Sequence, residues 1–531
     1  MRATVLLATA AMLTATAAAP ALAQTAPRVE EASIADLDTM MANGSATSEA
    51  ITQAYLARIA AMDRAGPTLR AVIATNPDAL AEARASDARR KAGKSLGALD
   101  GIPVLVKDNI ETKELPTTAG SLALKDNLTG RDAPLVAELR KAGAVILGKT
   151  NLSEWANIRS AHSISGWSAV GGLVRNPYAL DRNACGSSSG SGAAIAASFA
   201  AVGIGTETDG SVVCPSSMTG LVGLKPTLGM ISRTHVVPIS HSQDTPGPMA
   251  RSVRDAAILF SAMVASDPAD PATKNAGKYR HDFAASLSPG ALKGLRVAVL
   301  RPDMPDAFKA QYEAALAVLK AQGAILVDVE APRDGGRGEA EGAVLHTELK
   351  ADLDAYLATT PKAVTARTLD QVIAFDEANK ATEMPFFGQE IFLEAARTKG
   401  LTDPEYLGAR AKSLRLAGAE GIDAMLKQAQ ATILVEPSYS PAWLSDPVFG
   451  DVYPENFISA SELPAISGYP HLTVPMGLVR GLPVGLSFIA TAWGDQAVLD
   501  AGYAYEQASH ARVAPCYLPQ ADAGPGLEAA K

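Results

Sequence analysis

The sequence of 531 residues has few of the side chains that bind metals or form disulfide frameworks: seven histidines and three cysteines, Cys185, Cys214 and Cys516. Three cysteines permit one bridge at most, so a disulfide-rich scaffold is excluded. We expect all three to be buried as small apolar side chains. No Cys/His spacing resembles a zinc site. Because no cofactor motif is recognisable either, no metal or cofactor is expected.

Clustered positive charge is also missing. The formal net charge is -9, and the run Arg89-Arg90-Lys91 is typical of a solvated helix face. A nucleic-acid partner is therefore not expected, because phosphate binding needs grouped Lys and Arg.

The apolar stretch at residues 5–19 is shorter than the ~20 residues that a membrane-spanning helix needs. It follows Arg2 and precedes Ala21-Leu22-Ala23, which together are typical of a secretory signal peptide with a small-residue cleavage site. We expect residues 1–23 to be this signal peptide. The protein would then be periplasmic or secreted, without a stable membrane anchor.

Hydrophobic residues make up 47% of the chain, enough for a large core. Short apolar runs predict buried strands, and patterns with helical periodicity lie between them. The strands are expected at 104–106, 144–147, 295–300, 324–329, 434–435 and 472–474, and the helices at 31–64, 77–92, 133–142, 193–201 and 306–322. This alternation predicts an α/β fold with a mixed central sheet covered by helices on both faces.

We expect residues 24–531 to form a single large domain. Residues 332–343 are expected to be an exposed loop, and 345–430 to be largely helical. The region 330–430 is a candidate helical cap subdomain.

Lys107 ends the apolar run Val104-Leu105-Val106. A lysine at a strand end is commonly a surface charge. If it is buried, it loses its charge readily because desolvation disfavours the ammonium. A neutral lysine is a usable general base near pH 7.

Two Gly/Ser-rich segments follow, CGSSSGSG at 185–192 and GTETDGSVVCPSS at 205–217. Glycine beside serine lets backbone N–H groups approach a substrate, as in an oxyanion hole. A plain linker is disfavoured, because the apolar run at 221–224 follows directly.

Gly186 to Gly190 also matches the G-x-S-x-G elbow of α/β-hydrolases, with Ser188 as the nucleophile of an esterase. An elbow requires a buried strand immediately before it, whereas residues 175–183 are polar. His471 or His510 could complete a triad by chain order, but neither has a distinctive setting. We therefore disfavour this alternative.

Several motifs in fixed order resemble the amidase signature family. They are VKDNI around Lys107, GKTNLSEWAN at 148–157, RNPY at 175–178, CGSSSGSG, TDGS at 208–211 and LVGLKPT at 221–227. Ser187 and Ser211 lie 24 positions apart, the usual separation of the family's two catalytic serines. The resemblance covers about residues 50–260 and returns at 463–467 and 481–486. It implies the amidase signature fold.

The resemblance also implies roles for individual residues. Ser211 would be the acylated nucleophile, Ser187 the bridging serine on a cis peptide, and Lys107 the base. Ser188 would support Lys107 by hydrogen bonding. The oxyanion hole would consist of the backbone N–H groups of Thr208, Asp209, Gly210 and Ser211. A member that only binds amides is disfavoured, because all three catalytic positions are intact.

The sequence departs from the commonest family pattern at Cys185, Ser189 and Asp209. Because a carboxylate would repel an oxyanion, we expect Asp209 to turn its side chain away. This variant looks most like the bacterial peptide amidases, which implies hydrolysis of C-terminal peptide amides to free acid and ammonia. A general aliphatic or aryl amidase is the alternative. The glutaminase subunit of a tRNA-dependent amidotransferase shares the signature, but export and the acidic charge disfavour it.

The substrate would be a small-molecule or peptide amide. Tyr439, Trp443 and Phe449, in the loop at 436–450, are our candidates for a wall of its binding site, although such aromatic residues are as often plain core.

Overall fold

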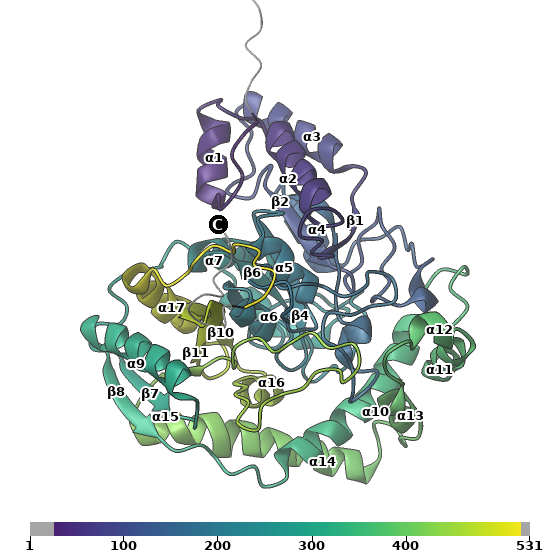
Figure 1. Ribbon diagram of the computed structural model, residues 1–531, viewed down its shortest axis with the longest axis vertical. Helices are drawn as coiled ribbons and strands as arrows, with labels where there is room; N and C mark the ends of the chain where they lie inside the picture. The colour runs from purple at the N-terminus through teal and green to yellow at the C-terminus, as the bar shows by residue number, and fades with distance from the viewer. Residues whose placement is uncertain (1–25, 522–531) are drawn as a thin grey trace, which may run out of the picture.

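The computed structural model describes residues 26–521, so the predicted signal peptide lies outside the described residues. Within that range, eleven strands form one sheet in the order β1-β3-β2-β4-β6-β5-β10-β11-β9-β7-β8 (Figure 1). In chain order the strands are β1 (Val72–Thr75), β2 (Pro103–Lys107), β3 (Val145–Thr150), β4 (Val202–Glu207), β5 (Val222–Lys225), β6 (Thr245–Ala250), β7 (Arg296–Leu300), β8 (Ile325–Val329), β9 (Ile433–Pro437), β10 (His471–Val479) and β11 (Leu482–Ile489).

The sheet is mixed, as the sequence predicts. β2 runs parallel to both β3 and β4, and β7 runs parallel to both β8 and β9. The pairs from β4 through β6, β5, β10 and β11 to β9 are antiparallel. Because β2 and β4 are parallel neighbours, their carboxyl ends lie together, and this is where open α/β sheets usually bind ligands.

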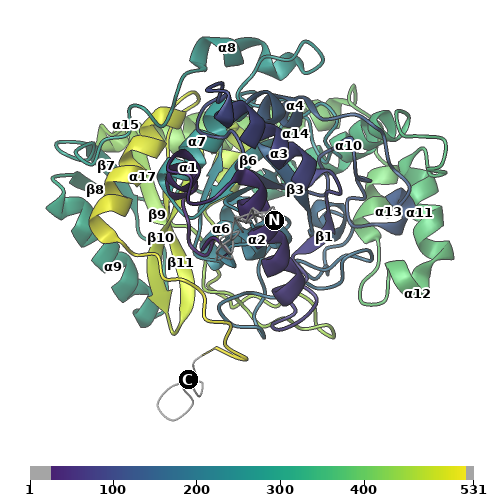
Figure 2. The ribbon, with the colours of Figure 1, turned by 90° about the horizontal axis from the view of Figure 1, so that it is seen from above.

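Helices cover the sheet and its ends (Figure 2). In chain order they are α1 (Ile34–Ala42), α2 (Ser48–Met62), α3 (Ala79–Lys91), α4 (Pro134–Lys141), α5 (Ser189–Ala196), α6 (Val213–Met218), α7 (Val253–Met263), α8 (Ala276–Tyr279), α9 (Asp306–Ala321), α10 (Arg337–Leu357), α11 (Leu369–Ala378), α12 (Lys380–Glu383), α13 (Glu390–Ala396), α14 (Pro404–Ala417), α15 (Asp423–Ala429), α16 (Glu462–Ser467) and α17 (Asp495–Ser509).

Alternating side chains of β7 show that both faces of the sheet are covered. Val297 and Val299 belong to the main core, together with residues of α9 and α17. Ala298 and Leu300 belong to a separate cluster that includes residues of α15. Successive strand residues point to opposite faces, so both faces of this part of the sheet are buried.

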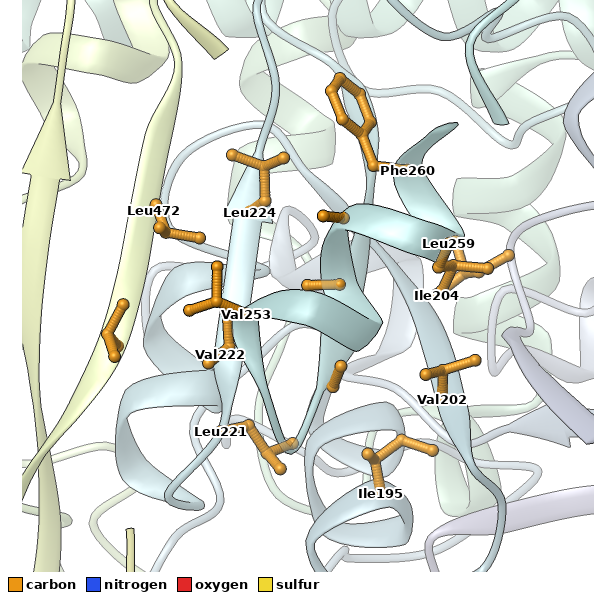
Figure 3. Packing of buried hydrophobic residues seen from close by; sticks show 14 of the residues in the cluster. Ile195, Val202, Ile204, Leu221, Val222, Leu224, Val253, Leu259, Phe260 and Leu472 are labelled. Carbon is orange, nitrogen blue, oxygen red and sulfur yellow. The ribbon is translucent and has the colours of Figure 1, made fainter. Parts of the chain in front are cut away.

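The main core continues under the segments that carry the motifs. Val202 and Ile204 of β4 and Val222 of β5 pack with Phe260 of α7 and Ile195 of α5 (Figure 3). All five side chains are fully buried. This packing fixes the carboxyl end of β4, from which the TDGS turn departs.

Two sequence predictions need correction. The helix predicted at 193–201 is α5, which begins at Ser189 and ends at Ala196. The loop predicted at 332–343 is wrong from residue 337, where α10 begins. Gly338 and Gly342 favour a loop from residue 337 onward, but the buried side chains of Ala340 and Val344 hold this part as helix.

The region predicted to be helical does contain α10 to α15. Side chains of α10, α11 and α13 form their own cluster with Leu124 and Trp155, and α11 to α13 lie together at one end of the molecule (Figures 1 and 2). That this region is a separate cap subdomain stays a prediction.

Candidate active site

Lys107 is the last residue of β2, and its side chain is fully buried. Its Nζ lies 2.8 Å from the Ser187 Oγ, 2.8 Å from the Thr206 Oγ1 and 3.2 Å from the Thr206 carbonyl oxygen. Within residues 26–521, Lys107 forms no ion pair, and its hydrogen-bond partners are Ser187 and Thr206.

Burial lowers the pKa of Lys107 to about 7, because desolvation disfavours the ammonium. The carboxyl groups of Asp244 and Glu207 oppose this shift without cancelling it. Lys107 therefore has a substantial neutral fraction near pH 7, as a general base requires.

Ser187 follows a cis peptide bond from Gly186, as the resemblance implies. It is fully buried, two residues before α5. The next residue joins the two serine-containing segments, because the Ser188 N–H donates to the Ser211 carbonyl oxygen at 3.2 Å. The structure therefore brings Lys107, Ser187 and the Ser211 turn into one cluster.

Ser211 lies in the turn between β4 and α6 and lines a cavity of about 320 Å³. Gly210 precedes it with φ +79, and a Cβ at that position would come within 2.0 Å of the Tyr439 hydroxyl oxygen. Glycine is thus required both by the backbone conformation and by the close packing of Tyr439.

The four predicted oxyanion donors differ in availability. The Glu207 carboxylate accepts hydrogen bonds from the N–H groups of Val212 and Val213, at 2.8 and 2.9 Å, and the Gly210 N–H also stabilises it. Within residues 26–521, the N–H groups of Thr208, Asp209 and Ser211 have no hydrogen-bond partner. These three N–H groups are free to bind a substrate oxygen, whereas that of Gly210 faces Glu207.

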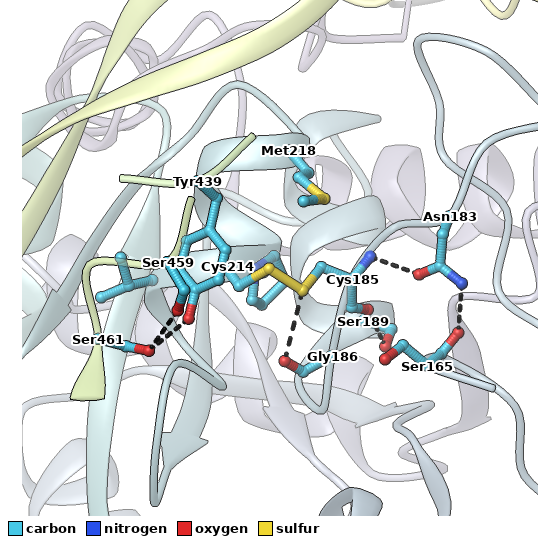
Figure 4. Close-up of a disulfide and its surroundings, with 12 residues drawn as sticks. Ser165, Asn183, Cys185, Gly186, Ser189, Cys214, Met218, Tyr439, Ser459 and Ser461 are labelled. Carbon is cyan, nitrogen blue, oxygen red and sulfur yellow. Dashed lines mark hydrogen bonds between the residues drawn. A yellow bond between two sulfur atoms is a disulfide. The ribbon is translucent and has the colours of Figure 1, made fainter. Parts of the chain in front are cut away.

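The expectation that all cysteines are buried and unpaired is wrong. Cys185 and Cys214 form a disulfide, with Cα atoms 5.9 Å apart (Figure 4), and Cys516 is exposed. The two half-cystines lie 29 positions apart, on either side of the two predicted catalytic serines, so only the fold reveals that they meet. Both also line the cavity.

The prediction of a direct hydrogen bond between Ser188 and Lys107 is wrong too. The Ser188 Oγ donates to the Thr206 carbonyl oxygen at 3.1 Å and accepts from the Thr206 N–H at 3.2 Å. Support for Lys107 therefore passes through Thr206, whose Oγ1 also accepts a hydrogen bond from the Asn109 side chain at 3.0 Å. Sequence reasoning missed Thr206, because a threonine in a strand has no signature of its own.

The elbow alternative fails on geometry. Ser188 is fully buried and does not line the cavity, and no strand directly precedes it. The His471 Nε2 lies 2.6 Å from the Ser487 Oγ, and burial lowers the pKa of His471 to about 3. His510 is the residue after α17 and has no place in the cavity lining.

Aromatic side chains form part of the cavity wall. Tyr439 and Trp443 line it, together with Tyr453 and Phe457, which sequence reasoning did not single out. Trp443 and Phe457 pack edge to face with ring centroids 5.7 Å apart. Phe449 does not line the cavity, and 75% of its surface is exposed.

Within the described residues, His241, Glu348 and Asp352 are the one group spaced to hold a metal ion. The Glu348 oxygens already accept hydrogen bonds from Ser240, Ser242 and Tyr406. These bonds give the carboxylate a structural role, and none of the three metal-spaced residues lines the cavity.

Comparison with known proteins places the chain in a family. The family model described as Amidase matches residues 50–499, and the chain belongs to this family. The chain is 49% identical to the native peptide amidase from Stenotrophomonas maltophilia, with a TM-score of 0.88 over 92% of this chain and 99% of that one. It is 36% identical to a probable amidase of Arabidopsis thaliana over 92% of each chain. It is also 34% identical to one subunit of the glutamyl-tRNA(Gln) amidotransferase of Roseiflexus castenholzii, over 89% of this chain and 95% of that one.

The fold and the family together define a hydrolase that acts on amide carbon–nitrogen bonds. The predicted amidase signature fold is confirmed. In the part of the chain that the structure describes, the helices are too short or too polar to cross a membrane.

Proposed function

We propose that this chain is a serine amidohydrolase that converts C-terminal peptide amides to the free acid and ammonia. One observation carries the mechanism: the buried Lys107 amine, with its pKa lowered to about 7, lies 2.8 Å from the Ser187 hydroxyl beside the cavity that Ser211 lines. A neutral amine in this position can drive a relay between two hydroxyl groups.

In the first half-reaction, the Ser211 Oγ attacks the amide carbon and passes its proton to the Ser187 Oγ. Ser187 gives its own proton to the Lys107 Nζ. The N–H groups of Thr208, Asp209 and Ser211 stabilise the negative charge on the substrate oxygen. The relay then returns a proton to the amide nitrogen, the carbon–nitrogen bond breaks, and ammonia leaves. Water hydrolyses the resulting Ser211 ester by the same relay in reverse, which releases the acid.

The residues that line the cavity support a peptide as the acyl part of the substrate. Its aromatic wall, Tyr439, Trp443, Tyr453 and Phe457, offers apolar surface for varied side chains. The similarity to a solved peptide amidase extends over 92% of the chain. A general aliphatic or aryl amidase uses the same relay, so the difference lies in the acyl part that the cavity accepts.

A panel of amides, assayed for released ammonia, tests the proposal. Mass spectrometry of an incubated peptide amide should show a gain of about one dalton as NH₂ becomes OH on hydrolysis of the acyl-enzyme, with internal peptide bonds intact. Efficient turnover of acetamide-sized amides, with none of peptide amides, would defeat the peptide-amide assignment. The membership in the amidase family would survive that result.

Export to the periplasm or the medium, after removal of residues 1–23, is part of this proposal. The disulfide between Cys185 and Cys214 supports it, because such bonds persist in oxidising compartments. Sequencing the N-terminus of the mature protein tests the cleavage site.

A further inference from the structure

The cavity lining carries one carboxyl group that the proposed relay does not use, that of Asp209, and a second, that of Glu341, interacts with it from outside the lining. Asp209 lines the cavity, and its Oδ1 is buried without a hydrogen-bond partner. Glu341 of α10 is 8% exposed; burial raises its pKa well above the usual range, and the charge of Asp209 raises this pKa further. Neither carboxyl group is among those that act on Lys107.

Asp209 is placed to act on the substrate in two ways. Its N–H is one of the three free donors of the proposed oxyanion hole. Its carboxyl group departs from the same residue and lies near Ser461 and Tyr439. A substrate whose carbonyl oxygen binds the Asp209 N–H therefore has its reacting carbon close to the residue that carries this carboxyl group.

One oxygen of the Asp209 carboxyl group, Oδ1, lacks a hydrogen-bond donor, although Ser461 stabilises the group. Glu341 accepts a hydrogen bond from the Gln243 Nε2 at 2.7 Å, and that same nitrogen donates to the Thr208 carbonyl oxygen. The Gln243 Oε1 is a second buried acceptor without a partner. Buried acceptors without donors are uncommon in folded proteins, and a bound ligand is one way to satisfy them. The missing partner is therefore an N–H or O–H donor.

We propose that Asp209 is a specificity-determining residue whose carboxylate accepts a hydrogen bond from the α-nitrogen of the substrate, the nitrogen on the carbon next to the scissile carbonyl. This inference rests on the proposed function and names the substrate class within it. Every amino-acid or peptide amide carries this N–H, whereas simple aliphatic and aryl amides lack it. The same carboxylate repels the carboxylate of the product acid, which favours its release.

The charge state of Asp209 makes the selection depend on pH. Its pKa is raised to about 7, chiefly by burial and in part by the charges of Glu207 and Glu462, while Ser461 and Lys225 oppose the shift. Arg337, in contact with Glu462 at 2.8 Å, offsets part of the negative charge that acts on Asp209. Above pH 7 the group is mainly a carboxylate, the stronger acceptor; below pH 7 it is protonated and the selection weakens.

Two substrates with the same ring and chain isolate this contact: N-acetyl-phenylalaninamide, which has the α-N–H, and 3-phenylpropanamide, which does not. The measured quantity is the ratio of their kcat/KM values in the wild type, Asp209→Asn and Asp209→Ala. Damage to the oxyanion hole lowers both values alike and cancels in the ratio. Glu339→Ala, which removes an exposed carboxylate of α10 that does not line the cavity, is the matched control.

We expect the wild type to favour the peptide-type amide, and the ratio to fall about tenfold or more in Asp209→Ala, as for a lost hydrogen bond to a charged group. Asp209→Asn should give an intermediate ratio, since its side-chain oxygen still accepts a hydrogen bond. Glu339→Ala should give the wild-type ratio. In the wild type the ratio should fall as pH drops through about 7, because Asp209 becomes protonated. Protonation of Lys107 lowers kcat/KM for both substrates alike and cancels in the ratio. In Asp209→Ala it should be independent of pH.

An unchanged ratio in Asp209→Ala, with N-acetyl-phenylalaninamide still hydrolysed, would overturn this inference and leave the peptide-amide proposal intact. Hydrolysis of 3-phenylpropanamide without any turnover of N-acetyl-phenylalaninamide by the wild type would overturn both.

Discussion

Cys185 and Cys214 are joined by a disulfide that ties the turn before Ser187 to the helix after Ser211. Cys185 lies two residues before Ser187, and Cys214 lies three residues after Ser211. The bond therefore holds the two segments of the proposed relay at a fixed separation. Positioning of reacting groups is worth much of an enzyme's rate, so this bond concerns both activity and stability.

Removing this disulfide should destabilise the protein. Closing a loop of 29 residues is worth about 3–4 kcal/mol in the chain-entropy model. The double variant Cys185→Ala, Cys214→Ala should unfold at lower temperature and lose activity. Scanning calorimetry and ammonia release measure the two effects. Cys516→Ala, at an exposed free cysteine, is the control and should match the wild type. A double variant with unchanged stability and rate would show that packing alone positions the two serines.

The nucleophile is the subject of the second prediction. Ser211→Ala should abolish turnover and leave the fold intact, because one small hydroxyl is lost at the wall of a cavity. Ser188→Ala should retain clearly more activity, since Ser188 only holds Thr206. A serine-directed phosphonate should label the wild type and not Ser211→Ala. If Ser188→Ala were inactive and Ser211→Ala active, the nucleophile would be Ser188.

The third prediction concerns pH. The relay needs neutral Lys107, and its pKa is about 7, so kcat/KM should fall as pH drops below 7 and level off above it. Lys107→Ala should lose several orders of magnitude in rate. His471→Gln should keep the same acid limb, because the pKa of His471 is already lowered to about 3. If the loss of activity at low pH disappeared in His471→Gln, the titrating group would be His471 and not Lys107.

The three residues proposed as catalytic are easier to name from the sequence than the contacts that support them. Lys107, Ser187 and Ser211 fall in short motifs with fixed spacing, so a family resemblance is enough to name them. The disulfide could not be derived in this way, because its two cysteines sit in separate motifs whose contact depends on tertiary structure. The start of α10 was missed for a related reason: the local pattern around Gly338 and Gly342 is weak, and burial of Ala340 decides for helix.

The α/β class followed from apolar runs at strands such as β2, β3 and β7, which are buried and continuous. β6 (TPGPMA) was missed, since proline and glycine are poor strand formers. It is nevertheless a central strand, paired with both β4 and β5. Its place is set by its two neighbours rather than by its own residues.

Thr206 is the support that sequence reasoning missed, and it provides the last prediction. Its Oγ1 accepts hydrogen bonds from Lys107 at 2.8 Å and from the Asn109 side chain at 3.0 Å. Thr206→Val keeps the shape of the side chain but removes this acceptor. We expect kcat/KM to fall about tenfold or more, because the Lys107 amine loses a contact that aims it at Ser187.

The pH profile of Thr206→Val separates this role from simple loss of packing. An acceptor stabilises the ammonium form of Lys107 more than the amine, so its removal should lower the pKa further and move the acid limb below pH 7. Thr206→Ser, which keeps the hydroxyl, should restore both the rate and the position of the limb. If Thr206→Val were slow but kept its acid limb at the wild-type pH, Thr206 would act on the structure of β4 alone and not on the charge of Lys107.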